Sequence, residues 1–360
     1  MSNIIFKNVR LGNKKSACFS IDDMIFPLEK IVAVLGAKDV GKTEFMELLT
    51  GKVKPYSGTI TYEDENMAIK SKSDLFFVDD KTYLPAYSSL NALMEKYEKE
   101  YPAFSKETAV KYFEKMEIPV EKYHYRNFDR KVQDAINCIF AIAARTKYTV
   151  LDQPCRNLNL KLRAMIYEFA KEDYELCPRT IIISSNIGID IDSVASQVVY
   201  IRAKKALYNL PYDEVDKFAV GLLGKRDVID SVTKNLETFY SNELEDDMKQ
   251  VIIRNELSFE MKQDLALKGV ITQYVNMINF HGYIVKEDFG LDELARAGTY
   301  AADIADNKAH NRATRRIKEG APKAIIARQQ NPQSVAGRIT EQKKETFMEK
   351  LKRILTSDLF

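Results

Sequence analysis

The chain has 360 residues, of which 45% are hydrophobic and 29% are charged, and its net charge at pH 7 is +2. This length predicts two or three folded units, and no apolar run approaches the ~20 residues of a membrane-spanning helix, nor do residues 1–6 resemble a secretory signal. The absence of a C-x-x-C pair argues against a disulfide framework or a metal site, so we expect a cytoplasmic protein with four reduced thiols, Cys18, Cys138, Cys155 and Cys177.

The first segment with chemical meaning is an apolar run that leads into a glycine-rich loop. Residues 31–35 (IVAVL) predict a buried strand. The loop that follows has the spacing G-x-x-x-x-G-K-T of a phosphate-binding P-loop. Its residues are Gly36, Ala37, Lys38, Asp39, Val40, Gly41, Lys42 and Thr43. Residues 43–49 then predict the helix that follows such a loop, so this is the candidate nucleotide-binding site.

Each motif residue has a chemical task at this spacing. Gly36 and Gly41 allow a tight backbone turn that points N–H groups at an anion. Lys42 reaches the outer phosphates, and the hydroxyl of Thr43 ligates Mg²⁺. The alternative is a relic loop that still packs well but no longer binds a nucleotide.

Several weaker motifs follow along the chain. They are residues 51–60 (GKVKPYSGTI), 148–159 (YTVLDQPCRNLN), 179–186 (RTIIISSN) and 198–201 (VVYI). In this order and spacing they resemble the nucleotide-binding domain of ATP-binding-cassette (ABC) ATPases. Residues 84–90 and 101–104 are similar to exporter-type ABC subunits of low-GC Gram-positive bacteria.

The resemblance covers about residues 3–210 and implies both a fold and a set of ligands. It implies an α/β, ABC-type P-loop NTPase domain at residues 1–210, with a mixed sheet core and an α-helical subdomain at about residues 88–135. It implies ATP and Mg²⁺ as cofactors, with Thr43 and Asp152 as metal ligands. It also implies a second ABC subunit, in a homo- or heterodimer, and membrane subunits that hold the protein at the inner face of the cell membrane.

The chain departs from the ABC pattern where catalysis takes place. The Glu that normally follows the Walker B Asp152 is Gln153, an amide that cannot act as a general base. That loss alone costs about 10²–10⁴-fold in rate. The switch histidine aligns with Asn186. None of the chain's three histidines lies near that position in the sequence, since they are His124, His281 and His310.

Two further motifs have also changed. The Q-loop glutamine aligns with Asp80, which becomes a third candidate metal ligand. The signature sequence aligns with residues 128–132 (FDRKV), where Asp129 replaces a Ser and Lys131 replaces a Gly. Residues 11–13 contain no aromatic side chain that would stack on adenine. The resemblance with these departures implies ATP–Mg²⁺ binding with little or no hydrolysis.

Beyond residue 210 the motifs cease. Residues 211–290 predict a small α/β or helical accessory domain that carries no catalytic constellation. Its expected elements are helices at 227–243 and 258–277 and short strands at 251–253 and 283–285. His281 would lie beside the last of these apolar strands, and we expect it to be a structural residue rather than a ligand.

Residues 291–360 predict a basic helical tail. Between residues 307 and 353 there are about 13 Lys and Arg and about four Asp and Glu, a net charge of about +9. Since the whole chain has a net charge of +2, the rest has a net charge of about −7. This charge asymmetry favours an acidic partner for residues 307–360. The partner would be an acidic protein surface, an anionic membrane face or nucleic acid. The alternatives are a helix packed back on the body and a solvated end.

Two functions follow from these patterns. The first is a degenerate ABC-type subunit that binds ATP–Mg²⁺ and acts as a structural or regulatory component of a membrane-associated export assembly. The second is a soluble, nucleotide-responsive scaffold or nucleic-acid-associated protein that uses its basic tail.

Overall fold

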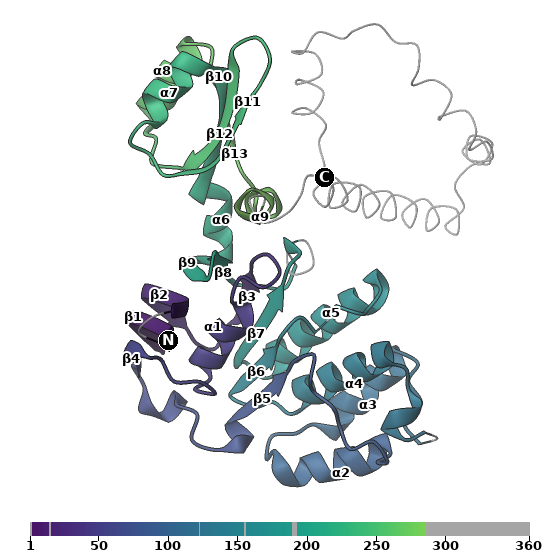
Figure 1. Ribbon diagram of the computed structural model, residues 1–360. Helices are drawn as coiled ribbons and strands as arrows, with labels where there is room; N and C mark the ends of the chain where they lie inside the picture. The colour runs from purple at the N-terminus through teal and green to yellow at the C-terminus, as the bar shows by residue number, and fades with distance from the viewer. Residues whose placement is uncertain (1, 14–15, 122, 155, 189–192, 286–360) are drawn as a thin grey trace, which may run out of the picture. The chain divides into compact units, whose positions relative to one another are not determined.

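The computed structural model describes residues 2–13, 16–121, 123–154, 156–188 and 193–285 (Figure 1). The chain divides into two compact units, residues 1–290 and residues 291–360. The predicted basic tail and its acidic partner therefore lie outside the described residues. Within the described residues, no helix is long and apolar enough to cross a membrane.

A mixed sheet forms the core of the N-terminal part. Within the described residues it has nine strands in the order β4-β1-β2-β9-β8-β3-β7-β6-β5. The strands are β1 (Asn3–Asn13), β2 (Ser16–Pro27), β3 (Ile31–Leu35), β4 (Ser57–Tyr62), β5 (Leu75–Val78), β6 (Tyr148–Leu151), β7 (Thr180–Ser185), β8 (Gln197–Arg202) and β9 (Lys205–Pro211). Strands β8, β3, β7, β6 and β5 run parallel to their neighbours in this series. Every residue of β3, β6 and β7 is buried, as expected for parallel strands covered on both faces.

The helices of this part begin with N-cap residues that the sequence supplies. They are α1 (Lys42–Leu49), α2 (Leu90–Glu100), α3 (Lys106–Lys115), α4 (Arg130–Ala143) and α5 (Leu160–Leu176), with short 3₁₀ turns at Glu65–Met67, Lys72–Asp74 and Tyr125–Asn127. In four of them the N-cap side chain accepts a backbone N–H of the first helical turn, and these N-cap residues are Ser89, Ser105, Asp129 and Asn159. Figure 1 shows α2 to α5 grouped beside β5, β6 and β7. The predicted α-helical subdomain corresponds to α2, α3 and the start of α4.

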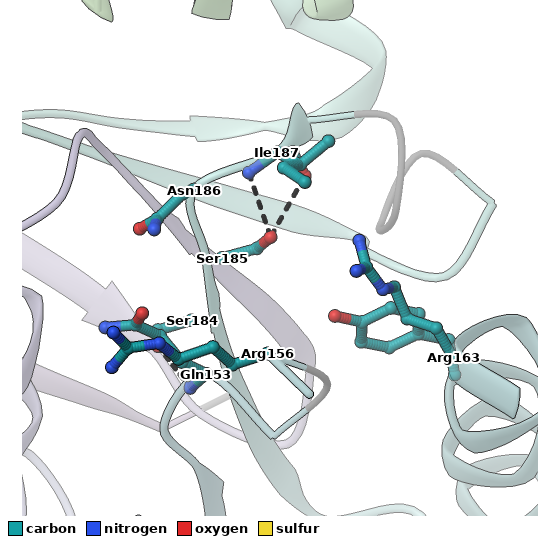
Figure 2. Close-up of a pocket in the computed structure, with 8 residues that line it drawn as sticks. Gln153, Arg156, Arg163, Ser184, Ser185, Asn186 and Ile187 are labelled. Carbon is teal, nitrogen blue, oxygen red and sulfur yellow. Dashed lines mark hydrogen bonds between the residues drawn. The ribbon is translucent and has the colours of Figure 1, made fainter. Parts of the chain in front are cut away.

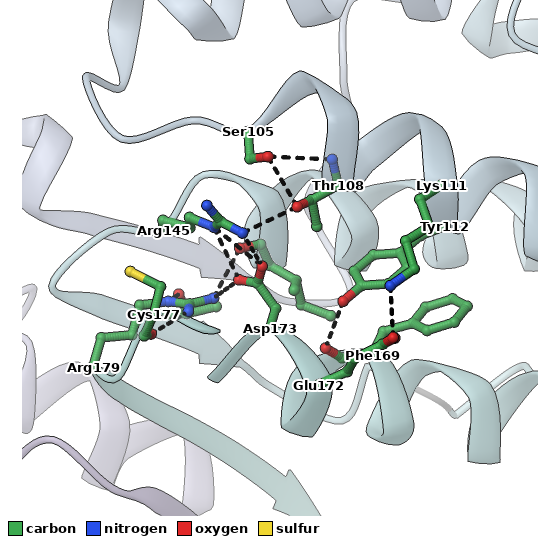
Figure 3. Close-up of polar contacts among 12 residues, drawn as sticks. Ser105, Thr108, Lys111, Tyr112, Arg145, Phe169, Glu172, Asp173, Cys177 and Arg179 are labelled. Atoms are coloured by element: carbon green, nitrogen blue, oxygen red, sulfur yellow. Dashed lines mark hydrogen bonds and ion pairs between the residues drawn. The ribbon is translucent and has the colours of Figure 1, made fainter. Parts of the chain in front are cut away.

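A buried ion cluster connects α3, α4 and α5 (Figure 3). Asp173 of α5 is fully buried and accepts from Arg145 at 2.7 Å and from Arg179 at 2.9 Å. Arg145 also donates to the hydroxyl of Thr108 in α3 at 3.1 Å. Beside this cluster the ring of Tyr112 stacks on Phe169, with centroids 4.1 Å apart. One carboxylate with two arginines therefore fixes the helices to the sheet that carries the motifs.

The accessory region is a separate four-stranded sheet with helices. Its elements are α6 (Tyr212–Phe218), β10 (Ala219–Lys225), α7 (Arg226–Thr233), β11 (Thr238–Glu243), β12 (Met248–Arg254), α8 (Phe259–Leu267), β13 (Ile271–Tyr274) and α9 (Met277–Val285). The strands are antiparallel in the order β11-β12-β10-β13. From β10 to β13 this is the β-α-β-β-α-β topology of ferredoxin-like domains.

The two faces of this sheet bury different residues. Val220, Leu222, Val251 and Ile253 belong to one small core, together with residues of α7 and α8. Ile252, which alternates with them, instead belongs to the large core that includes Phe280 and Ile284 of α9. The accessory sheet is therefore covered on both faces, by α7 and α8 on one side and by α9 on the other.

Three expectations for this region were wrong. The helix expected at 227–243 ends at Thr233, and residues 238–243 form β11. The helix expected at 258–277 ends at Leu267, and β13 follows. The strand expected at 283–285 is the end of α9. Phe280 and Ile284 are one helical turn apart and are both buried, so packing across the sheet decided this element.

Candidate nucleotide site

Four parallel strands bring the motifs to one edge of the large sheet. Residue Leu35 of β3 pairs with Ser185 of β7, and Leu151 of β6 pairs with Ile183 of β7 and with Val78 of β5. The segments that follow these strands therefore meet at the carboxyl edge of the sheet. In open α/β sheets this crevice is where ligands bind.

The two P-loop glycines lie where a side chain has no room. A Cβ on Gly36 would lie 2.4 Å from the carbonyl oxygen of Ile201, and a Cβ on Gly41 would lie 2.4 Å from the ring of Phe19. Gly41 also has φ = 109°, a left-handed conformation that favours glycine. The loop conformation is therefore fixed by packing as well as by any ligand.

The ammonium group of Lys42 is turned into its own loop. Lys42 is only 3% exposed, and its Nζ donates to the carbonyl oxygens of Gly36, at 2.9 Å, and of Ala37. Burial lowers the pKa of Lys42 to about 8, against the opposing effect of the Asp152 carboxylate. A bound phosphate would therefore compete with two backbone carbonyls for this ammonium group.

A chain of hydrogen bonds joins the candidate metal ligands. The hydroxyl of Thr43 donates to Asp152 at 2.5 Å, and the hydroxyl of Ser184 donates to its other carboxylate oxygen at 2.6 Å. Burial raises the pKa of Asp152, while these two hydroxyls act in the opposite direction. A hydroxyl and a carboxylate are hard oxygen ligands of the kind that Mg²⁺ prefers, so the residues present fit this ion.

A cleft with a volume of about 160 Å³ opens beside this pair. It is lined by Asp39, Thr43, Val78, Asp79, Asp80, Arg130, Asp134, Asp152, Gln153, Pro154, Arg156 and Asn157. Asp80 lies in it as expected, and its backbone carbonyl accepts from Arg130 at 2.9 Å. Among the described residues, however, no group of three or more His, Cys, Asp and Glu is arranged to hold a metal ion. A metal-binding role for Asp80 therefore stays a prediction.

Gln153 lies directly beside Thr43 and Asp152, the two candidate metal ligands. Its backbone N–H donates to Ser184 at 2.8 Å, and its backbone is left-handed, with φ = 49°. It lines both the cleft and a second cavity of about 210 Å³ (Figure 2). Figure 2 shows Gln153 and Arg156 on one side of this cavity and Arg163 on the other. The residue at the expected position of the general base thus has a defined place next to Asp152.

Asn186 has a neighbour that the sequence did not indicate. Nε2 of His281 lies 2.9 Å from the carbonyl oxygen of Asn186, although 95 residues separate them. His281 is in helix α9 rather than beside a strand. The absence of a nearby histidine in the sequence was therefore misleading, because the accessory region brings one to the end of β7. No sequence signal predicted this contact, since it depends on how α9 packs.

The geometry can be compared with known proteins. No protein-family model matches the chain. The lantibiotic transport ATP-binding protein SrtF of Streptococcus pyogenes is 23% identical over 213 residues, covering 58% of this chain and 90% of SrtF. The bacitracin transport ATP-binding protein BcrA of Bacillus licheniformis is 26% identical over 229 residues, covering 60% of this chain and 72% of BcrA.

The fold is also similar to that of solved ABC transporter subunits. A solved ATP-binding subunit of an ABC transporter covers 60% of this chain and 92% of that chain, with a TM-score of 0.50 at 13% identity. The chain has the fold of an ABC-type ATP-binding domain. At one sheet edge of this domain, the P-loop residues 36–43, Asp152 and Asn186 come together. The roles of Gln153 and Asn186 in catalysis stay predictions.

Residues 128–132, the predicted signature segment, have a local structural role. Asp129 is the N-cap of α4, and its carboxylate accepts the backbone N–H of Val132 at 2.9 Å. Arg130 forms an ion pair with Asp134 at 2.8 Å and lies over the ring of Tyr83. Asp129 and Arg130 therefore cap a helix and contact the segment that holds Asp80 and Tyr83 within the same chain.

Proposed function

We propose that this protein is an ATP-binding ABC subunit that binds ATP with Mg²⁺ and hydrolyses it slowly or not at all. Its role is structural or regulatory, within a larger export assembly at the inner face of the membrane. The observation that carries the proposal is the hydrogen bond between Thr43 and Asp152, with Gln153 as the next residue. The two candidate metal ligands are retained, and the side-chain amide of Gln153 beside them cannot accept a proton.

Several contacts support nucleotide binding. Lys42 is the buried cation of the loop, and the Thr43–Asp152 pair lies one residue further along. When bound, Mg²⁺ would be held by these two side chains and would neutralise phosphate charge. The acidic side chains of the cleft, such as Asp39 and Asp80, would disfavour a phosphate without its cation. Binding should therefore depend strongly on the metal.

The side chains at the reaction centre argue against turnover. A water molecule beside Asp152 would meet the amide of Gln153, which orients it but does not take its proton. Asn186 has an amide side chain, so it supplies no imidazole at the position where a switch histidine is expected. The proposed degeneracy therefore rests on two replacements in neighbouring segments of one site.

The setting of an export assembly rests on the relatives. Two of them are named as transport ATP-binding proteins for a lantibiotic and for bacitracin. A subunit of this kind would work beside a second ABC subunit and membrane subunits. Within such a complex, a site that holds ATP without hydrolysing it stabilises one conformation of the pair by its binding free energy.

The proposal is tested by isothermal titration of the full-length chain with ATP, with and without Mg²⁺. The matched variants are Lys42→Ala and Lys38→Ala, because Lys38 is an exposed lysine of the same loop. We expect Lys42→Ala to weaken binding by about 10- to 100-fold, the worth of a hydrogen bond to a charged group. Lys38→Ala should change it by less than about threefold. Equal heats for the wild type and Lys42→Ala, or no heat from either at millimolar ATP, would contradict the proposal.

A further inference from the structure

The contact between His281 and Asn186 joins the accessory region to the nucleotide edge of the ABC domain. The carbonyl oxygen of Asn186 can only accept, so Nε2 of His281 carries the proton in this contact. The other ring nitrogen, Nδ1, is buried and has no hydrogen-bond partner among the described residues, and the same is true of Oδ1 in the Asn186 side chain. Buried polar atoms without partners are uncommon and frequently mark functional sites.

The helix that carries His281 is held firmly by the accessory sheet. Phe280 packs against Phe239 of β11 with centroids 5.1 Å apart, and against Tyr200 of β8 at 5.0 Å. The backbone N–H of Met277 donates to Asp216 of α6 at 2.9 Å. These contacts hold α9, and with it the backbone of His281, in place beside Asn186.

On the other side of the contact, Asn186 belongs to the nucleotide site. Ser185, the residue before it, pairs with Leu35, the residue before the P-loop. Asn186 and Gln153 also line the same cavity (Figure 2). The positive charge of Lys42 contributes to lowering the pKa of His281. The backbone group that His281 contacts is thus one residue away from the strand pair that leads into the P-loop.

Gly188 shows how closely the loop and the ring fit. A Cβ on Gly188 would lie 3.3 Å from Cβ and from Cδ2 of His281. Few Cβ atoms approach a neighbour so closely, so the loop or the ring would have to shift. The segment from Asn186 to Gly188 is therefore joined to α9 by one hydrogen bond and lies so close to the His281 ring that a Cβ at position 188 would crowd it.

We propose that His281 is a positioning residue that couples the accessory region to the nucleotide site through the backbone of Asn186. When ATP–Mg²⁺ fixes the position of residues 186–188 at the end of β7, the His281 contact transmits this constraint to α9. In the opposite direction, docking of α9 holds the loop in the conformation that binds nucleotide, because such coupling is reciprocal. This inference rests on the proposed function, since it requires that ATP binds.

Hydrogen exchange of the full-length chain, with and without saturating ATP–Mg²⁺, tests the coupling. Peptides that cover residues 277–285 should exchange at least fivefold more slowly with nucleotide in the wild type. His281→Gln keeps an N–H donor near the position of Nε2 and should retain this response. His281→Leu fills a similar volume without a donor, so it should still bind ATP in a titration but lose the response in α9.

A second variant covers the case in which His281→Leu does not fold. Gly188→Ala disturbs the contact from the loop side and leaves α9 unchanged, and it should also lose the response. If the wild type binds ATP but α9 does not respond, or if His281→Leu responds like the wild type, the coupling is overturned. If the wild type does not bind ATP at all, the proposed function fails and the coupling fails with it. The two failures are thereby distinguished.

Discussion

The hydroxyl of Thr43 lies 2.5 Å from the carboxylate of Asp152, a residue 109 positions later in the chain. This contact brings the P-loop and the segment after β6 together. Both carboxylate oxygens of Asp152 are engaged, one by Thr43 and the other by Ser184. The two candidate metal ligands are therefore held in place by hydrogen bonds within the protein, which lowers the free-energy cost of ordering them.

Thr43→Val should weaken the Mg²⁺ dependence of ATP binding by about tenfold, because it keeps the shape of the side chain and removes its hydroxyl. Thr43→Ser is the matched control and should keep most of the dependence. The measurement is ATP affinity across a series of Mg²⁺ concentrations. Equal Mg²⁺ dependence in both variants would show that Thr43 does not hold the ion.

ATP turnover by the purified chain should remain near background, because Gln153 cannot serve as a base. Gln153→Glu should not produce normal turnover on its own, since Asn186 and the changed signature at Asp129 remain. Phosphate release is the measurement, with Lys42→Ala as the blank. A wild-type rate of the order of 1 s⁻¹, ordinary for an enzyme, would refute the proposed lack of hydrolysis.

The affinity for ATP should fall above pH 8. Burial lowers the pKa of Lys42 to about 8, so above that pH the free protein loses the proton that the ammonium group needs to bind phosphate. Each further pH unit should cost up to about tenfold in affinity. Titrations from pH 7 to pH 9.5 measure this, and in Lys42→Ala this component should be absent. A pH-independent wild-type affinity would show that Lys42 is not titrating in this range.

Asp173→Asn should destabilise the protein by about 3–5 kcal/mol, because Arg145 and Arg179 would lose their buried counter-charge. Glu172→Gln is the neighbouring control, since Glu172 forms partly exposed ion pairs with Lys111 and Lys115 and should cost less than about 1 kcal/mol. Urea unfolding followed by circular dichroism gives both values. Similar losses in the two variants would mean that the buried cluster in Figure 3 has no special weight.

His281 should make the protein less stable below pH 6.5. Burial lowers the pKa of His281 to about 4, and the nearby charge of Lys42 acts in the same direction. The imidazole takes up a proton near pH 6.5 in the unfolded chain but only near pH 4 in the folded chain. The free energy of unfolding therefore falls as the pH drops from 6.5 towards 4. Between pH 6.5 and pH 5 the loss should be about 2 kcal/mol.

Other carboxylates titrate in the same range, so the comparison that isolates His281 is with His281→Leu. The difference between the two unfolding free energies should shrink by this amount as the pH falls. A constant difference from pH 6.5 to pH 5 would show that the imidazole is protonated in the folded protein.

The sequence alone determined the fold of the N-terminal part and the location of its candidate site. Strand β3 and the P-loop that follows it are local patterns, because burial on both faces requires an apolar run and the loop requires glycines. Asp152 was found through the resemblance of residues 148–159 to the corresponding ABC motif, which is also a pattern of neighbouring residues. Such signals depend on neighbouring residues in the chain, so they survive without knowledge of the tertiary structure.

Tertiary structure decided what depends on distant packing. Residues 283–285 have the composition of a strand, yet they form part of α9 because Phe280 and Ile284 pack on the accessory sheet. Asp129, which aligns with the signature sequence, caps helix α4, a role that its charge alone did not reveal. His281 reaches Asn186 only because a helix from the accessory region covers the end of β7. The energy of such a contact comes from groups 95 positions apart, and no local pattern of side chains encodes where they meet.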